Sequence, residues 1–204
     1  MQSPRSARRS TQLTRRRLID GAVDILRREG LAAATTGRIA GAAGLKQPTF
    51  YVHFTDRDEV FEAAAVEIGQ RMLDKVQRQH LKFDAGDMRH SLRATYSAII
   101  ASFLAEPELT RIFLRHRTDD GTVLGRVFGR QVQQAREAIM ASLPLYGVTA
   151  SLSSAEAYVE IIVSGLLGML DGLVDGRLAD REAAVDAIAD VTAKMLRSQD
   201  GKRR

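Results

Sequence analysis

The sequence predicts an all-α protein of about nine helices. Apolar residues recur at three- and four-residue intervals through most of the 204 residues, as they do on one face of a helix. No segment of useful length alternates apolar and polar residues in the manner of a half-buried strand, and no repeat of about 20–50 residues is visible. Glycine, proline and capping residues lie between the periodic segments, where helices end and begin.

The N-terminal segment, residues 1–10, mixes Arg, Ser and Gln with Pro4 and lacks an apolar period, so we expect a disordered basic arm there. A helical period begins at about Thr11, with an apolar face formed by Leu18, Ala22, Ile25 and Leu26. Gly30 is expected to end this helix with a positive φ angle.

Two short helices separated by a glycine are predicted in residues 36–54. Thr35 and Thr36 offer an N-cap for the first, and Gly44 can take the positive φ angle that a tight turn needs. Pro48 fits the first turn of the second helix, where its missing N–H leaves no hydrogen bond unmade. The side chains expected to face inward are Ile39, Ala40, Ala43, Phe50 and Phe54. Those left to face outward are Gln47, Thr49, Tyr51 and His53.

Positive charge is concentrated at this end of the chain. Residues 1–54 carry ten Lys and Arg against three Asp and Glu, a formal charge of +7, whereas the other residues carry 20 basic and 22 acidic side chains, or −2. A helix, a tight turn and a short polar helix form a unit that places side chains in the major groove of DNA. We therefore predict double-stranded DNA as a partner, although a basic segment alone could equally be a solvated tail.

Four further helices are predicted before residue 146. They begin at capping or breaking residues, namely Asp56 with Glu59, Gly86 with Asp87, Glu106 with Pro107, and Gly121. The first is long, from residue 57 to about residue 82, and the fourth stops before Pro144, followed by a loop over residues 146–154. Their apolar stripes are expected to hold Phe61, Ala65, Ile68, Met72, Val76, Leu92, Tyr96, Ile99, Phe103, Leu109, Ile112, Phe113, Val123, Val127, Val132, Ala135 and Ile139.

The last two helices are predicted over residues 154–174 and 180–197. The first is apolar almost all round, so it needs cover on several sides. The second has a one-sided stripe of Ala184, Ile188, Val191 and Met195. Ser164, Gly165 and Gly168 would allow a close approach by another helix, either at a dimer face or in the central core of a monomer.

Composition and spacing argue against several other classes. The chain has no cysteine, hence no disulfide and no Cys-ligated zinc, and its four histidines share no metal-binding helical spacing. No glycine-rich phosphate loop or nucleophile elbow is present, so we expect no enzyme, no metal and no cofactor. The N-terminus lacks a secretory signal, and the longest apolar run, residues 161–170, stops at Asp171, so we expect a cytoplasmic protein without a membrane span.

Residues 11–75, about a third of the chain, resemble the N-terminal DNA-binding domain of the TetR family of bacterial transcriptional regulators. The matching motifs follow an apolar helix and are Thr36-Gly-Arg-Ile-Ala, Ala-Ala-Gly-Leu45, Pro-Thr-Phe-Tyr-Val-His-Phe54 and Thr55-Asp-Arg-Asp-Glu-Val-Phe61. The resemblance implies a helix-turn-helix DNA-binding domain over residues 11–56 and a ligand-binding and dimerisation domain over residues 57–204. It also implies a homodimer in which the last two helices of each chain form a four-helix bundle.

The resemblance also assigns roles to residues at matching positions. Gln47 is the best base reader, because its amide can pair with both N6 and N7 of adenine. Phosphate or base contacts are expected from Thr36, Arg38, Lys46, Gln47, Pro48, Thr49, Tyr51, His53 and Arg57. Gly37 stands where one family member has a base-reading arginine, so that member's operator cannot be transferred to this chain.

A small-molecule pocket is the other site that the resemblance implies. Its candidate residues are Tyr96, Phe103, Arg111, Phe113, His116, Phe128 and Met169, although ordinary core packing is the favoured reading of any single aromatic residue. The predicted function is a transcriptional repressor that a small molecule releases from a palindromic operator. The alternatives are a ligand-independent or architectural DNA-binding protein with a filled C-terminal core, and, more remotely, a helical enzyme.

Overall fold

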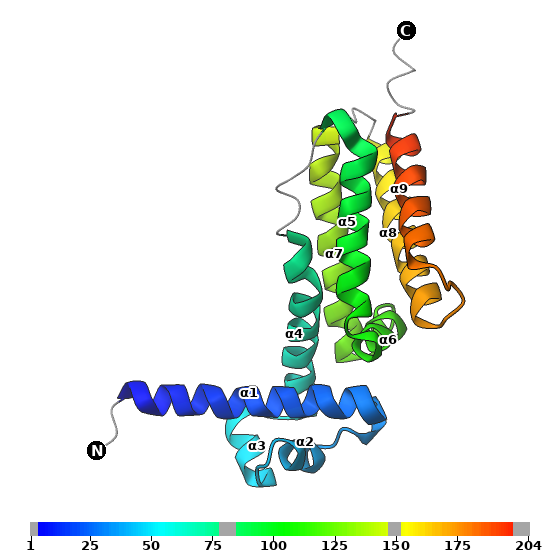
Figure 1. The fold of residues 1–204 in the computed structure, drawn as a ribbon. Coiled ribbons are helices and arrows are strands. Elements are labelled where there is room, and N and C mark those ends of the chain that lie inside the picture. Colours follow the sequence, from blue (N-terminus) through cyan, green and yellow to red (C-terminus); the bar gives the residue numbers. More distant parts are fainter. Residues whose placement is uncertain (1–3, 78–84, 147–151, 198–204) are drawn as a thin grey trace. The chain divides into compact units, whose positions relative to one another are not determined.

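The computed structural model describes residues 4–77, 85–146 and 152–197, and the described part is helical throughout, with no strand (Figure 1). Its α-helices are α1 (Pro4–Glu29), α2 (Thr36–Ala42), α3 (Gln47–His53), α4 (Arg57–Gln77), α5 (Met88–Leu104), α6 (Pro107–His116), α7 (Val123–Ser142), α8 (Leu152–Val174) and α9 (Arg181–Arg197). Short 3-10 turns occur at Leu31–Ala33, Ala85–Asp87 and Leu143–Tyr146. The all-α prediction is confirmed.

The chain forms two compact units. Residues Met1–Ile68 and Arg115–Phe128 make the first, and Gly69–Leu114 and Gly129–Arg204 make the second. The division falls within α4, so the start of that helix packs with the first unit. The predicted boundary between residues 56 and 57 divides the chain by expected function, with DNA binding before it and ligand binding and dimerisation after it. The compact units divide the chain within α4 instead, and the functional boundary stays a prediction.

The first helix is longer than the sequence suggested. α1 begins at Pro4 rather than near Thr11, so the expectation of a disordered arm over residues 1–10 is wrong from Pro4 onward. The reason is that an apolar period marks only the part of a helix that packs. Arg, Gln and Ser can continue the backbone hydrogen bonds of an exposed helix, and Pro is tolerated in a first turn.

Helices α1, α2 and α3 build the core of the first unit as predicted. Phe50 and Phe54 are buried, with ring centroids 5.7 Å apart, and Gly44 turns the chain between α2 and α3 with φ +66°. Gly21 lets α1 approach α2 closely, because a Cβ there would lie 2.9 Å from the Ile39 carbonyl oxygen. Ile39, Ala40 and Ala43 are buried, and Gly30 ends α1 with φ +81°.

The predicted capping box at the start of α4 is present. The Glu59 N–H donates to Asp56 Oδ1 over 2.9 Å, and the Thr55 N–H donates to Glu59 Oε2 over 2.7 Å. Phe61, Ala65 and Ile68 of the predicted stripe are buried. The rest of the predicted span, residues 78–82, lies outside the described residues, as do residues 147–151 of the predicted loop.

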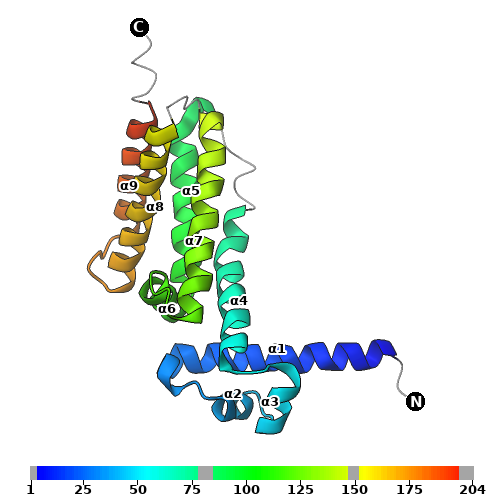
Figure 2. The same cartoon turned by 180° about the vertical axis from the view of Figure 1, so that it is seen from behind.

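In the second unit, α5, α8 and α9 lie side by side with the later part of α7 (Figures 1 and 2). Leu92, Tyr96, Ile100 and Phe103 of α5 are buried, whereas Ile99 is half-buried. The Tyr96 hydroxyl lies 2.9 Å from Thr192 Oγ1 of α9, and both groups are buried. This hydrogen bond satisfies two buried polar groups where the two helices cross.

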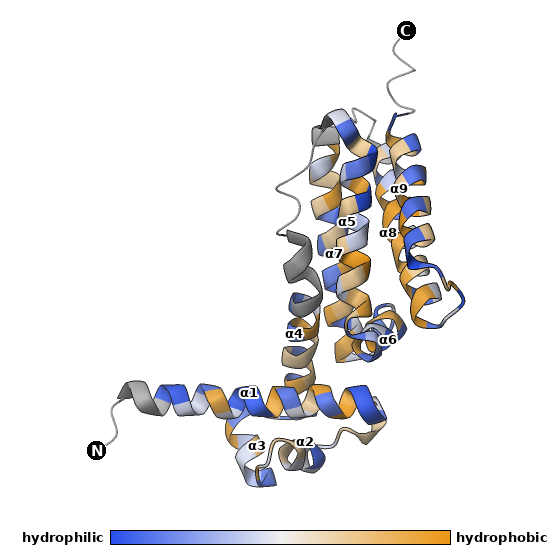
Figure 3. Ribbon diagram, viewed as in Figure 1, coloured by the Kyte–Doolittle hydropathy of each residue, from blue (hydrophilic) through white to orange (hydrophobic). Residues whose placement is uncertain are grey.

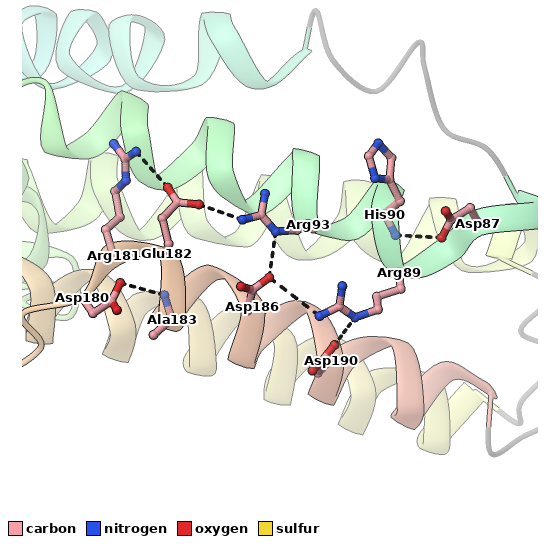
Figure 4. A network of polar contacts seen from close by, with 10 residues as sticks. All are labelled: Asp87, Arg89, His90, Arg93, Asp180, Arg181, Glu182, Ala183, Asp186 and Asp190. Carbon is pink, nitrogen blue, oxygen red and sulfur yellow. Dashed lines mark hydrogen bonds and ion pairs between the residues drawn. The ribbon is translucent and has the colours of Figure 1, made fainter.

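A ladder of ion pairs also joins α5 to α9 (Figure 4). Arg93 of α5 lies 2.7 Å from Asp186 and 2.8 Å from Glu182 of α9, and Arg89 pairs with Asp190. Hydrogen bonding by Arg181 and Arg93 lowers the pKa of Glu182. Hydrogen bonding by Arg89 lowers the pKa of Asp190. Since both helices place their charges at four-residue intervals, the pairs repeat once per turn.

The turns of helix α8 that are visible in Figure 3 are coloured mostly as hydrophobic, and the helix is long and apolar enough to cross a membrane by length and composition alone. The core helix of a soluble protein passes the same test. Only 33% of its most apolar window is buried within the chain, and Ile161 is 53% exposed. Its surface therefore has apolar area that the described part of the chain leaves uncovered.

One register prediction for α9 is wrong. Ala184 and Ile188 are buried as expected, but Val191 is 58% exposed. The buried face of α9 instead continues through Ala189, Thr192, Ala193 and Leu196. An apolar residue counted into a stripe by spacing can belong to a neighbouring face when more than one face of the helix is apolar.

Candidate nucleic-acid interface

Three predicted DNA-contacting residues from α2 and α3 meet in one polar group. Gln47 Nε2 donates to Thr36 Oγ1 over 3.0 Å, and Thr36 Oγ1 lies 3.3 Å from the Tyr51 hydroxyl, with either atom able to donate. Gln47 and Tyr51 are exposed, and Thr36 is half-buried. The residues that spacing places on the outward side of α3 therefore form a connected surface with the first residue of α2.

Local sequence explains the placement of these side chains. Thr35 caps α2 by accepting a hydrogen bond from the Arg38 N–H, which makes Thr36 the first helical residue. Pro48 lies in the first turn of α3 and is exposed, as predicted. Thr35 thus caps the N-terminus of α2, whereas Gly44 and Pro48 suit the chain to the turn and to the first turn of α3.

Two cationic candidates differ in what they contact. Arg38 forms a double hydrogen bond from Nη2 to the Glu29 carboxylate, at 2.6 Å and 2.5 Å, so the end of α1 holds this side chain. Lys46 is exposed at the N-cap position of α3. A phosphate would compete with Glu29 for Arg38, whereas it would meet the exposed Lys46 ammonium directly.

The remaining candidates are spread over the same surface. Thr49 and His53 are on α3, where both are half-buried. Arg57 is exposed at the start of α4, with its guanidinium carbon 5.6 Å from the centre of the Phe61 ring. The structure places all nine candidate residues in the first compact unit, and their DNA contacts stay a prediction.

The sequence reasoning missed Val52. Its side chain is 77% exposed, more than any other large apolar residue for which exposure is described. Val52 lies two residues from both Phe50 and Phe54, which places it about 200° around the helix from each at 3.6 residues per turn. The spacing of the two buried phenylalanines would have located it on the outward face beside Tyr51 and Pro48.

Two arginines of α1 contact residues at the end of α2 and just after α3. Arg17 Nη2 donates to the Ala43 carbonyl oxygen over 2.6 Å, which caps the end of α2. The Arg15 guanidinium carbon lies 4.6 Å from the centre of the Phe54 ring. Part of the basic charge predicted for DNA therefore also stabilises the turn between α2 and α3.

The seven ligand-pocket candidates do not gather in one unit. Tyr96, Phe103, Arg111, Phe113 and Met169 belong to the second unit, and His116 and Phe128 belong to the first. The Phe103 and Phe113 ring centroids are 5.6 Å apart, and both rings are buried, as is Phe128. Met169, in contrast, is half-buried.

Arg111 and His116, two polar candidates for the pocket, have contacts or burial that limit their ability to bind a ligand. Arg111 Nη2 donates to the Val174 carbonyl oxygen over 2.9 Å at the end of α8, and Arg111 also pairs with Glu108. Burial lowers the pKa of His116, so its imidazole is largely neutral near pH 7 and attracts an anion weakly. Ligand binding by these residues stays a prediction.

Among the described residues, no three His, Asp or Glu side chains lie close enough together to hold a metal ion. This finding concerns the arrangement of possible ligands in residues 4–77, 85–146 and 152–197.

Known proteins share both the motif and the fold. Residues 18–64 match the family described as bacterial regulatory proteins, tetR family. The match covers less than a quarter of the chain, so the similarity to this family concerns residues 18–64. A nicotine-responsive transcriptional repressor of Paenarthrobacter nicotinovorans is 37% identical over 69 residues, which are 34% of this chain and 36% of that protein. The class D tetracycline repressor of Escherichia coli is 36% identical over 63 residues, 31% of this chain and 29% of the repressor.

These sequence matches span about a third of the length of the relatives, so they concern the TetR-family DNA-binding domain. The fold matches extend further. A transcriptional regulator from a Rhodococcus species superposes with a TM-score of 0.69 at 16% identity, over 90% of this chain and 96% of the other. A fatty acid degradation regulator of Bacillus halodurans gives 0.68 at 17% identity, over 95% and 96%. At these identities the likeness establishes the fold alone.

Proposed function

We propose that this chain is a cytoplasmic DNA-binding transcriptional regulator, and specifically a repressor that a small molecule releases from its operator. The single observation that carries the proposal is the connected polar surface of Gln47, Thr36 and Tyr51, exposed on a helix-turn-helix within a segment of formal charge +7. A short helix of this kind enters the major groove, where base edges differ in donors and acceptors.

Repression and ligand release are supported by the relatives. The Paenarthrobacter protein is a nicotine-responsive repressor, and the Escherichia coli protein is a tetracycline repressor. Ligand binding that weakened operator affinity about 100-fold would require roughly 2.7 kcal/mol of preference for one conformation, within the usual allosteric range. These relatives do not identify the effector of this chain, because they match only about a third of it.

A homodimer through α8 and α9 completes the proposal. An apolar helix with only 33% of its apolar window buried, together with exposed Ile161 and Val191, is the surface that a second copy would cover. A Cβ on Gly168 of α8 would meet nothing within 4 Å, which leaves room for a close helix approach. Two copies would present two α3 helices to successive major grooves of a palindromic operator.

A ligand-independent regulator is the second candidate, and one observation favours it. Phe103 and Phe113 pack edge to face, and the Tyr96 hydroxyl is bonded to Thr192, so these candidate pocket walls are already used in the core. Isothermal titration of a small-molecule library against the full chain separates the two readings. A compound that binds and weakens DNA affinity supports the ligand-responsive regulator.

The proposal as a whole is tested by competition binding of the full chain to duplex DNA. The specific duplex is one that the full chain has selected from a pool of random sequences. Fluorescence anisotropy should show an affinity for this duplex at least about 1,000-fold above that for a scrambled duplex of the same composition. Equal affinities for the two duplexes would refute sequence-specific regulation.

A further inference from the structure

The Gln47 side chain is held in one orientation by its neighbours on α2. Its Nε2 donates to Thr36 Oγ1 over 3.0 Å, and a Cβ on Gly37 would lie 3.7 Å from both Cδ and Oε1 of Gln47. The amide therefore lies over the first turn of α2, close enough that a Cβ on residue 37 would be in van der Waals contact with it. A side chain longer than a methyl group at residue 37 would displace it.

The Thr36 hydroxyl has a second neighbour that favours this orientation. Thr36 Oγ1 lies 3.3 Å from the Tyr51 hydroxyl. When Thr36 gives its own hydrogen to Tyr51, its oxygen can only accept from Gln47, which selects the NH2 end of the amide over the carbonyl end. With Thr36 as the donor to Tyr51, these three side chains from two helices select the NH2 end of Gln47 as the bonded end.

This arrangement leaves a defined pair of groups for DNA. An amide NH2 group carries two hydrogens, and one of them goes to Thr36. The free Oε1 acceptor and the second N–H donor match the N6 donor and N7 acceptor of adenine. Guanine presents two acceptors, O6 and N7, so the Oε1 atom would face an acceptor unless the amide turned over and lost its bond to Thr36.

We propose that Thr36 is a positioning residue that orients the Gln47 amide, with Tyr51 as its support, so that α3 reads adenine at the base opposite Gln47. This inference rests on the proposed DNA-binding function. It assigns Thr36 a role in sequence discrimination, whereas a phosphate contact would carry no sequence information.

The test compares Thr36→Val, which keeps the shape and removes the hydroxyl, with Thr36→Ser, which keeps the hydroxyl. Anisotropy measures the affinity of each full-length variant for two duplexes, one with adenine and one with guanine at the base opposite Gln47. The ratio of these two affinities is the quantity compared. We expect Thr36→Val to reduce this ratio about tenfold and Thr36→Ser to retain most of it, because a bidentate contact discriminates bases by roughly that factor or more. Loss of affinity for both duplexes alike, with an unchanged ratio, would overturn the positioning role.

A base analogue keeps the inference testable when a variant folds poorly. Replacing the adenine with unsubstituted purine removes the 6-amino group that Oε1 contacts. The purine analogue should weaken DNA binding by the chain that retains Thr36 about tenfold or more. It should weaken DNA binding by the Thr36→Val variant much less. Equal penalties for both proteins would refute the inference. Failure of the unsubstituted chain to prefer any duplex would refute the proposed function instead, so the two failures are distinguishable.

Discussion

At the residue scale, the candidate interface depends on a few side chains whose roles can be separated. Gln47 is exposed and oriented by Thr36, while Phe50 of the same short helix and Phe54 just after it are buried. The side chain proposed to read DNA and the side chains that fold the domain are therefore different residues of the same short segment. A substitution on the exposed face should change DNA binding without unfolding the domain, and a substitution on the buried face should do both.

Gln47→Ala should lower the ratio of affinities for operator and scrambled DNA by about 10- to 100-fold, because one bidentate base contact is lost. Anisotropy titration of both duplexes measures this ratio. Gln134→Ala, at an exposed glutamine of α7, is the matched control and should leave the ratio unchanged. Full discrimination by Gln47→Ala would show that another residue reads the operator.

Gly44→Ala should destabilise the chain by about 1–2 kcal/mol, because φ of +66° is unfavourable for a residue with a Cβ. The new Cβ would also lie 3.0 Å from Arg17 Nη2, which is bonded to the Ala43 carbonyl. Urea unfolding followed by circular dichroism measures the change. Gly41→Ala is the control, since nothing lies within 4 Å of its Cβ position and the helix should be stabilised slightly. Similar effects of the two substitutions would contradict the assigned role of the turn.

At the element scale, local signals predicted helix ends better than they predicted buried faces. The caps at Thr35, Asp56 and Asp87 were predictable because each depends on a side chain and a backbone N–H three residues away. The start of α1 at Pro4 was not, since exposed helical turns carry no apolar period. Val191 was misplaced because burial on α9 depends on the position of α5 and α8.

The candidate site follows the same division. The outward positions of Gln47 and Tyr51 follow from spacing along one helix, so the sequence was sufficient. The contacts Thr36–Gln47 and Arg38–Glu29 join separate helices, and their partners cannot be chosen before the helices are packed.

The ion pairs between α5 and α9 predict how stability responds to pH. The folded-state pKa values of Glu182 and Asp190 are lowered, so their contribution is present above the unfolded pKa of about 4 and is lost as pH falls through the lowered values. Thermal unfolding should therefore show Arg93→Gln less stable than the unsubstituted chain at pH 7, by a few degrees at most because the pairs are exposed. The difference should shrink toward pH 3. Arg177→Gln is the control, because it breaks an ion pair with Asp171, six residues away, and leaves the ion pairs between α5 and α9 in place.

A gap between the two proteins that stayed constant from pH 7 to about pH 3 would contradict the assigned electrostatic origin. Added salt offers a second check, because it screens exposed charges. The gap measured at pH 7 should narrow in about 1 M salt, where the screening length is about 3 Å.

At the scale of the whole molecule, the proposed dimer links the second unit to DNA recognition. Ile161→Glu with Val191→Glu would place charges on the exposed apolar surface of α8 and α9. Sedimentation should show a monomer, and operator affinity should fall at least about tenfold because only one α3 would engage. Val66→Glu adds a charge at an exposed valine of α4 and should leave the dimer intact. A double variant that stayed dimeric would place the interface elsewhere.

The measurement that tests the central claim most directly is selection of bound sequences from random duplexes by the full chain. Two α3 helices in successive major grooves predict an enriched inverted repeat whose half-site centres lie about 10 base pairs, or a multiple of that, apart. Each half-site should contain the adenine that Gln47 reads. Enrichment of no sequence, or of a single site without symmetry, would contradict the account.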